Sequence, residues 1–122
     1  IDIMNVNILN LKISYEVVKE TGADNFEVKQ NAANAVSNLV SRTPEIGEPF
    51  SITAVYNAIN EAGGVADVAN VDIFVQTGGV YSDYFINLDE YMSPDGRFIN
   101  MPHDVIWEVR LVGDDIKGVI LE

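Results

Sequence analysis

The sequence holds a single histidine and no cysteine, so few side chains are available for nucleophilic or acid–base chemistry. His103 stands next to Asp104, a pair suited to act as a general base with its orienting partner. Both residues lie at the entrance of a predicted strand, where adjacent side chains point to opposite faces. We therefore interpret His103 as a surface or loop histidine and predict no catalytic residue.

Clustered carboxylates are the second possible chemistry, because Ca²⁺ binds several oxygen atoms. The acids concerned fall in one loop and one turn: Asp83, Asp89, Glu90, Asp114 and Asp115. None follows the spacing of an EF-hand. No serine stands in a Gly-x-Ser-x-Gly elbow, and neither Gly63-Gly64 nor Gly78-Gly79 opens a helix after a strand, as a phosphate loop must. We expect no metal and no cofactor.

The composition describes one folded domain. The chain has 122 residues, 48% of them hydrophobic, with a formal net charge of -12. So negative a chain should repel nucleic acid and anionic membrane surfaces, and no apolar run reaches the ~20 residues of a membrane helix. Because the sequence starts at Ile1 rather than Met, we expect a single domain, residues 1–122, that is the C-terminal fragment of a longer structural protein.

The first half alternates like a strand and then takes a helical period. Residues 7–18 carry apolar side chains at every second position, which predicts a strand with one polar face. A helix should run from an N-cap at Asp24 or Asn25 to a stop at Pro44. Ser51 should cap a second helix, which Gly63 and Gly64 end.

The second half predicts strands around an irregular segment. Residues 65–76 read as a strand with a bend near Ala69 and Asn70. Residues 105–112 and 116–121 read as two strands joined by a tight hairpin turn at residues 113–115. The expected fold is α+β: a β-α-α-β unit with a C-terminal β-hairpin, and two helices packed on one face of a mostly antiparallel sheet.

Residues 78–102, here called the aromatic loop, are the least regular part. Short strands are predicted around residues 84–88 and 97–100, with a β-turn starting at Ser93. The half of the chain that holds this loop, residues 61–122, carries a charge of -9, and acids beside aromatic side chains are typical of a protein-binding face. The loop tyrosines fit either such a face or the domain's own core, whereas Trp107 is predicted to lie in the core. The candidate interface residues are Tyr81, Tyr84, Phe85, Tyr91, Ile106, Val112, Val119 and Leu121.

The order of features resembles a known family. A long strand and a helix lead to Gly47-Glu48-Pro49-Phe50-Ser51-Ile52, the entry to a second helix, and Gly64-Val65-Ala66-Asp67-Val68 leaves that helix. This resembles the C-terminal segment of baseplate-J-like proteins, the baseplate wedge proteins of T4-like contractile-tail bacteriophages. The likeness covers residues 9–75, and the first motif carries one extra residue. Residues 78–122 depart from the family's short ending.

The resemblance implies a structural role without catalysis. The chain would be part of a phage tail baseplate wedge, acting through dimer or ring contacts with itself and other wedge proteins during tail attachment and contraction. It would be located in the virion after assembly in the host cytoplasm. Apolar residues on the outer side of the C-terminal strands fit such contacts, because an apolar face without a partner is a liability.

Two other functions compete with this interpretation. A small peptide- or carbohydrate-binding module of a multidomain protein would use Tyr81, Tyr84 and Tyr91, and would need them exposed and stacked. A hydrolase would use paired carboxylates such as Asp83 and Asp89, and would need both in one pocket, about 5–10 Å apart.

Overall fold

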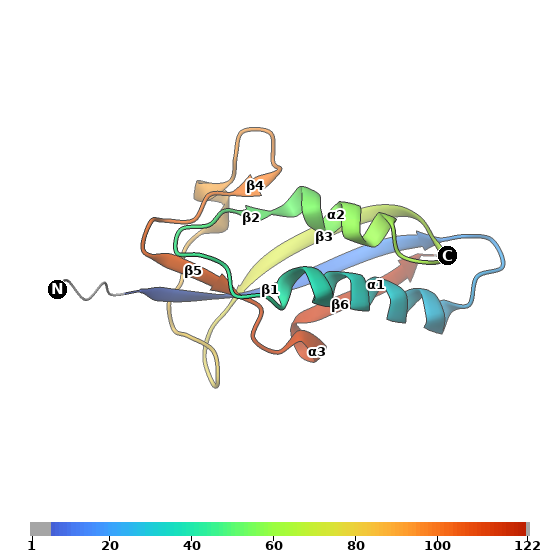
Figure 1. Cartoon of the computed structure of the whole chain (residues 1–122), viewed down its shortest axis with the longest axis horizontal. Helices are drawn as coiled ribbons and strands as arrows, with labels where there is room; N and C mark the ends of the chain where they lie inside the picture. The colour runs from blue at the N-terminus through green and yellow to red at the C-terminus, as the bar shows by residue number, and fades with distance from the viewer. Residues whose placement is uncertain (1–5, 122) are drawn as a thin grey trace.

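The structure is a computed structural model, and it describes residues 6–121. Its main sheet is built around β1 (Asn7–Lys19). On one side, β3 (Val65–Gln76) pairs with β1 in antiparallel orientation. On the other side, β5 (Val105–Glu108) and β6 (Ile116–Leu121) pair with β1 in parallel, one after the other along its length. Figure 1 shows β1 in the middle of this four-stranded sheet.

Two helices, α1 (Asn25–Val40) and α2 (Ile52–Asn60), cover one face of the sheet (Figure 1). As predicted, the side chains of Asp24 and Ser51 cap them by accepting backbone N–H groups of the first turns. The buried helix residues recur three or four positions apart, at Val28, Ala32, Val36, Val40, Ile52, Val55 and Ile59. This spacing presents one apolar stripe of each helix to the sheet. The chain thus has the predicted α+β fold.

The covered face of β1 forms the centre of the core. Its odd-numbered residues 9–17 are all buried, because successive strand side chains alternate between faces. Tyr15 packs so closely on Gly118 of β6 that any side chain at position 118 would overlap its ring. Trp107 of β5 lies in the core, as predicted, edge-to-face with Phe50 at 5.0 Å between ring centroids.

β3 contains the irregularity that the sequence predicts. Two consecutive residues of β1 pair with Asn70 and Val68, so Ala69 is left without a partner in the ladder. Ala66 is skipped in the same way one step further on. Each skipped residue is a β-bulge, which bends a strand and increases its twist. The bulges keep the valines of β3 on the covered face despite the change in their spacing.

The predicted C-terminal hairpin is wrong. β5 ends at Glu108, and a single helical turn, α3 (Val112–Asp115), stands where the hairpin turn was expected. Asp115 is only 1% exposed, and its carboxylate accepts the N–H of Leu111, which closes this turn. The two strands do not pair with each other; β1 is long enough for both to lie end to end along it. The sheet is therefore mixed rather than mostly antiparallel.

A second, two-stranded sheet holds part of the aromatic loop. β4 (Phe98–Ile99) pairs with β2 (Phe50–Ser51), which confirms the strand predicted around residues 97–100. The predicted turn is also present, since the N–H of Gly96 donates to the carbonyl oxygen of Ser93 at 2.9 Å. The loop is thereby fixed beside the start of α2.

The strand predicted around residues 84–88 is wrong. These residues belong to no strand of the described chain, and Leu88 begins a short 3-10 helix, η1 (Leu88–Tyr91). Ile86 and Leu88 are both buried in the core, so the alternation that suggested a strand reflects real burial. Alternating burial without a ladder partner produces an extended segment, because a strand also needs a neighbour for its backbone hydrogen bonds.

Candidate protein interface

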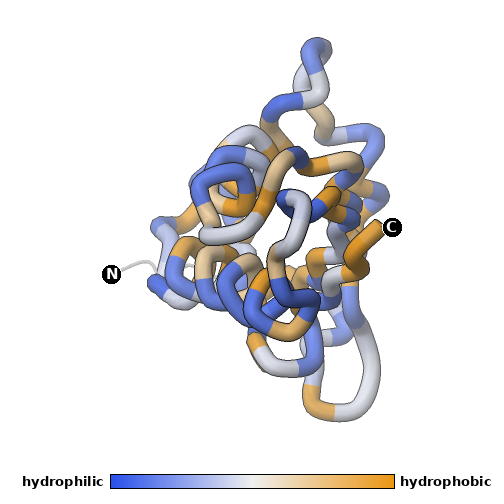
Figure 2. Tube along the Cα trace, turned by 90° about the vertical axis from the view of Figure 1, so that its right-hand side faces the viewer, coloured by the Kyte–Doolittle hydropathy of each residue, from blue (hydrophilic) through white to orange (hydrophobic). Residues whose placement is uncertain are grey.

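The outer face of the main sheet, which turns away from the helices, has a bare apolar end. Val18 of β1 and Leu121 of β6 are register partners there, and Val119 lies on the same side two residues earlier. Their exposed fractions are 40%, 37% and 55%. In Figure 2 the tube next to the C-terminus is correspondingly hydrophobic. We call these three side chains the β6 patch.

The opposite end of the outer face is covered by the aromatic loop. Asn10 of β1 is buried there: its amide oxygen accepts the N–H of Ser82 (2.6 Å), and its amide nitrogen donates to the carboxylate of Glu108 (2.8 Å). A polar side chain is tolerated in a buried position when its groups are hydrogen-bonded. The loop therefore covers the outer face near β5, and the β6 patch stays open.

Tyr81, a predicted interface residue, ties the aromatic loop to the start of β6. Its hydroxyl donates to Asp115 at 2.7 Å, and the side-chain amide of Gln76 approaches the same carboxylate oxygen at 3.5 Å. The hydrogen bond to Asp115 is the main reason that the pKa of Tyr81 is raised, because ionisation would place a second negative charge beside the carboxylate. Tyr81 thus has a structural role.

The other aromatic residues of the loop divide between core and surface. Tyr84 and Tyr91 are half-buried against the core, and burial is the main cause that raises the pKa of Tyr84. Phe85 is 64% exposed. The only close ring pair among residues 6–121 is that of Phe50 with Trp107, so the loop tyrosines form no stacked platform there. A sugar- or peptide-binding module would need such a platform.

The four interface residues predicted in the C-terminal segment do not form one surface. Val119 and Leu121 belong to the β6 patch. Ile106 faces the same way but is half-buried beside Ile8. Val112 is exposed on α3, outside both strands. The α3 turn separates Val112 from the residues of both strands.

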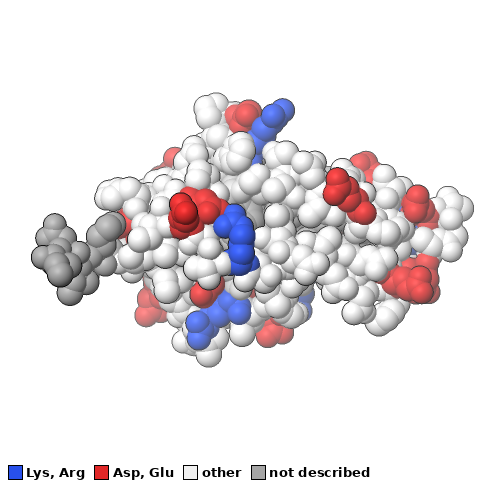
Figure 3. All heavy atoms as spheres, in the orientation of Figure 1, with Lys and Arg blue, Asp and Glu red and all other residues white. Residues whose placement is uncertain are grey.

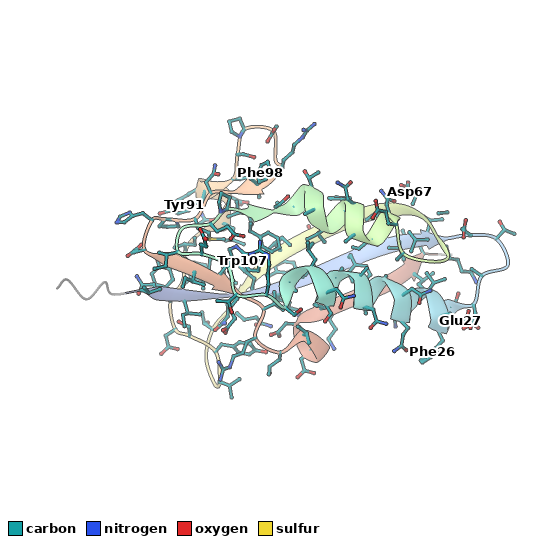
Figure 4. The ribbon with its side chains drawn as sticks, in the orientation of Figure 1. Phe26, Glu27, Asp67, Tyr91, Phe98 and Trp107 are labelled. Carbon is teal, nitrogen blue, oxygen red and sulfur yellow. The ribbon has the colours of Figure 1, made fainter. Side chains whose placement is uncertain are left out.

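Several exposed apolar residues lie outside the predicted interface set, and Val18, Phe74 and Phe26 are examples. Val18 belongs to the predicted first strand, at a position whose side chain shares the polar face of that strand. Phe74 shows the same signal in β3, and it is 49% exposed opposite Lys12. Phe26, 73% exposed at the start of α1, falls outside the apolar stripe of its helix (Figure 4). An apolar residue on a polar face was the available signal in each case.

The residues considered for chemistry lie apart. His103 is exposed, while Asp104 accepts a hydrogen bond from the side chain of Asn7 (3.1 Å). Asp83 and Asp89 are exposed, and only Asp89 borders a groove that also contains Asp72. Within residues 6–121 no three histidine or acidic side chains gather into a possible metal site. The same part of the chain contains no helix long and apolar enough to span a membrane.

A groove of about 360 Å³ beside Trp107 is lined by two arginine residues, Arg42 and Arg110. Arg42 forms an ion pair with Glu48, and its guanidinium lies 5.6 Å from the centre of the Trp107 ring. The hydrogen bond from Arg42 is the main cause of the lowered pKa of Glu48. Arg110 lines the same groove and lies 3.8 Å from Glu108. Each guanidinium already has a carboxylate neighbour. We therefore interpret this groove as part of the margin of the core and assign it no ligand.

Acidic side chains are spread over the face seen in Figure 3, and basic ones are few.

No model of a known protein family matches the chain, and no curated protein is a detectable relative of it. The geometry of the surface and the resemblance in the sequence therefore carry the functional argument.

Proposed function

We propose that this chain is a structural component of a phage tail baseplate wedge and that it acts by subunit–subunit assembly. The observation that carries the proposal is the β6 patch: Val18, Val119 and Leu121 stand together on a sheet face that no helix covers. Contiguous exposed apolar side chains at the margin of a sheet are suited to burial against another subunit. The partners would be a second copy of the chain and other wedge proteins, in the virion.

The two glycine motifs behind the resemblance have structural reasons in this fold. Gly47, at the entry to α2, has a φ of 76°, and its N–H donates to the carbonyl oxygen of Val105 at 2.7 Å. Gly64, at the exit, has a φ of 84°, and a Cβ there would lie 2.6 Å from a methyl group of Val28. Both positions favour glycine on backbone grounds. The two motifs thus mark the entry and the exit of α2, and the resemblance over residues 9–75 is the basis on which the baseplate role is proposed.

Charge supports the choice of partner class. The chain carries a formal net charge of -12, so association with nucleic acid or with an anionic membrane would work against strong repulsion. Apolar contact with protein subunits has no such cost. The mechanism we propose is burial of the β6 patch in a neighbouring subunit.

Light scattering over a range of protein and salt concentrations tests the proposal. We expect a dimer or larger species that persists at high salt, because apolar burial is not screened by ions. The double variant Val119→Asp/Leu121→Asp should reduce it to a monomer. Both side chains are exposed, so the free energy of unfolding should change by only about 0.5 kcal/mol.

The control is Val80→Asp. Val80 is an exposed apolar residue near the start of the aromatic loop, outside the β6 patch. This variant should associate like the unmodified chain. A strict monomer at every concentration, or association that survives in the double variant, would contradict assembly of this chain through the β6 patch.

A further inference from the structure

β6 is an edge strand without a second neighbour. Among residues 6–121, β1 is the only strand that pairs with it, and the six pairs run without a register shift. In a parallel ladder, alternate N–H and C=O groups of a strand point away from its partner. Those of β6 are therefore directed toward the lower margin of the sheet in Figure 1, where a further strand can pair with them.

A groove runs along the helix side of this edge. It lies between α1 and β6, has a volume of about 410 Å³, and is open to solvent. Its lining includes aromatic, small and lysine residues: Tyr15, Phe26, Lys29, Gln30, Ala33, Ile116, Lys117 and Gly118. Because Gly118 has no side chain, the floor at that point is the ring of Tyr15. Side chains of an added strand that face the helices would enter this groove.

The charge along this edge is opposite to that of the chain. Lys29 of α1 lines the groove, whereas the register places the side chain of Lys117 on the outer face of β6, with Val119 and Leu121. Neither lysine belongs to any ion pair found among the described residues, although acids outnumber bases by nineteen to seven in the sequence. Two unpaired amines beside an open strand edge attract a segment that carries carboxylates.

A second copy of the chain fits this edge poorly. Pairing β6 with β6 of another copy would bring Lys117 of each copy, and Lys29 of each copy, toward one edge, which is electrostatically unfavourable. The β3 strand of another copy is also unsuitable, because it is interrupted by bulges at Ala66 and Ala69, and its Val71 N–H already donates to the hydroxyl of Tyr56 (3.2 Å). The edge therefore calls for a different protein.

We propose that the β6 edge and the α1–β6 groove bind an extended segment of a partner protein, added to the sheet as a further strand, in which acidic residues alternate with apolar ones. The apolar side chains, which face the helices, would contact Tyr15 and Ala33, and the carboxylates, on the opposite face of the added strand, would pair with Lys117. This inference rests on the proposed assembly function and names a second contact of that function, made by the free backbone edge of β6 rather than by the β6 patch.

The test uses an eight-residue peptide that alternates glutamate and valine, titrated into the isotope-labelled protein and followed by amide NMR shifts. We expect binding with a dissociation constant on the order of 1 mM or tighter at low salt, with shifts and slowed hydrogen exchange in β6 and α1. A peptide with lysine in place of glutamate should bind at least about tenfold more weakly, because it meets like charges.

Variants locate the contact. Lys117→Glu should weaken binding of the glutamate peptide by about fivefold, because an exposed ion pair is lost and replaced by a repulsion. The control Arg97→Glu makes the same change in net charge on a residue outside β6 and α1, so its affinity should fall much less. Circular dichroism checks that each variant is folded.

Three results would overturn the inference: no binding of the glutamate peptide, equal binding of both peptides, or shifts that map away from β6 and α1. An equal loss of affinity in Lys117→Glu and in the control Arg97→Glu would also overturn the inference, because net charge alone would then explain the effect. None of these results bears on the β6 patch, whose test is the oligomeric state of Val119→Asp/Leu121→Asp, so the two proposals can fail separately.

Discussion

The two edges of the main sheet are protected to different degrees. At the β3 edge, the N–H of Val71 is satisfied by the Tyr56 hydroxyl, two bulges interrupt the ladder, and a groove of about 440 Å³ separates the strand from residues 85–89. At the β6 edge, six regular residues stand beside an open groove. Folded proteins commonly block exposed strand edges to prevent unwanted pairing. A regular edge left open is thus the better candidate for intended pairing.

The charges of the two edges differ as well. Asp67 and Asp72 lie along β3, with Asp67 near the end of α2 in Figure 4, whereas Lys117 lies on β6. The open β6 edge carries a basic residue and the blocked β3 edge carries acidic ones, so the two edges of the sheet differ in charge. A partner segment can therefore be selected for one edge by its own charge.

The largest effect is expected from closing the space over Gly118. Gly118→Ala should lower the free energy of unfolding by about 3 kcal/mol, because the new methyl group overlaps the buried ring of Tyr15. Urea denaturation measures the change. Gly113→Ala is the control, since a Cβ there meets no atom within 4 Å and the backbone φ is not positive. Equal stability of the two variants would show that β6 is not packed against Tyr15.

A slightly smaller effect is expected at the start of β6. Asp115→Ala should cost about 2 kcal/mol, because the Tyr81 hydroxyl and the Leu111 N–H lose a buried, charged acceptor. Asp114→Ala, an exposed neighbour in the same turn, should change stability by no more than about 0.5 kcal/mol. If Asp115→Ala were equally mild, the α3 turn would not depend on this carboxylate, and the placement of β6 would need another cause.

The protection of the β3 edge should be weakened by removing a single oxygen atom, that of the Tyr56 hydroxyl. Tyr56→Phe removes the hydroxyl that accepts the Val71 N–H and should cost about 1 kcal/mol. Hydrogen exchange should speed up at Val71 and stay unchanged in β6. Tyr91→Phe serves as a comparison, because no hydrogen bond of the Tyr91 hydroxyl is found in the described chain. Unchanged exchange at Val71 would mean that this edge is protected by other means.

The smallest effect concerns stability at high pH. The pKa values of Tyr15 and Tyr84 are raised mainly by burial, and that of Tyr81 mainly by its hydrogen bond to Asp115. A raised pKa favours the protonated folded state, so this contribution to stability is complete below about pH 10 and is lost as the pH rises through the folded-state values. Ultraviolet titration should show these tyrosinates forming late, and Tyr81→Phe should remove one of the late steps. Ordinary titration of all five tyrosines would contradict the contacts described for them.

Local signals in the sequence predicted much of this fold. The caps Asp24 and Ser51, the turn at Ser93 and the bulge at Ala69 were all found where the sequence placed them. Each depends on residues within a few positions of one another, so a short window contains the cause. The fold class followed from the same local periods.

The candidate interface was predicted only in part. Val119 and Leu121 were found exposed together, but Val112 was moved to α3 and Tyr81 was engaged by Asp115. The partners responsible lie 34 residues apart for Tyr81 and Asp115, so no short window contains both. Phe26 and Val18 escaped notice because their significance depends on the neighbours that the fold supplies.

The sequence by itself determined the two long helices and the long strands, because alternation, helical period and capping residues act over a few positions. Only the tertiary structure decided how the C-terminal strands pair. Residues 113–115 suit a hairpin when considered alone, yet burial of Asp115 and the long free side of β1 favour two parallel strands in line. That choice creates the open β6 edge, because backbone pairing is a competition between distant segments for the same hydrogen-bonding groups.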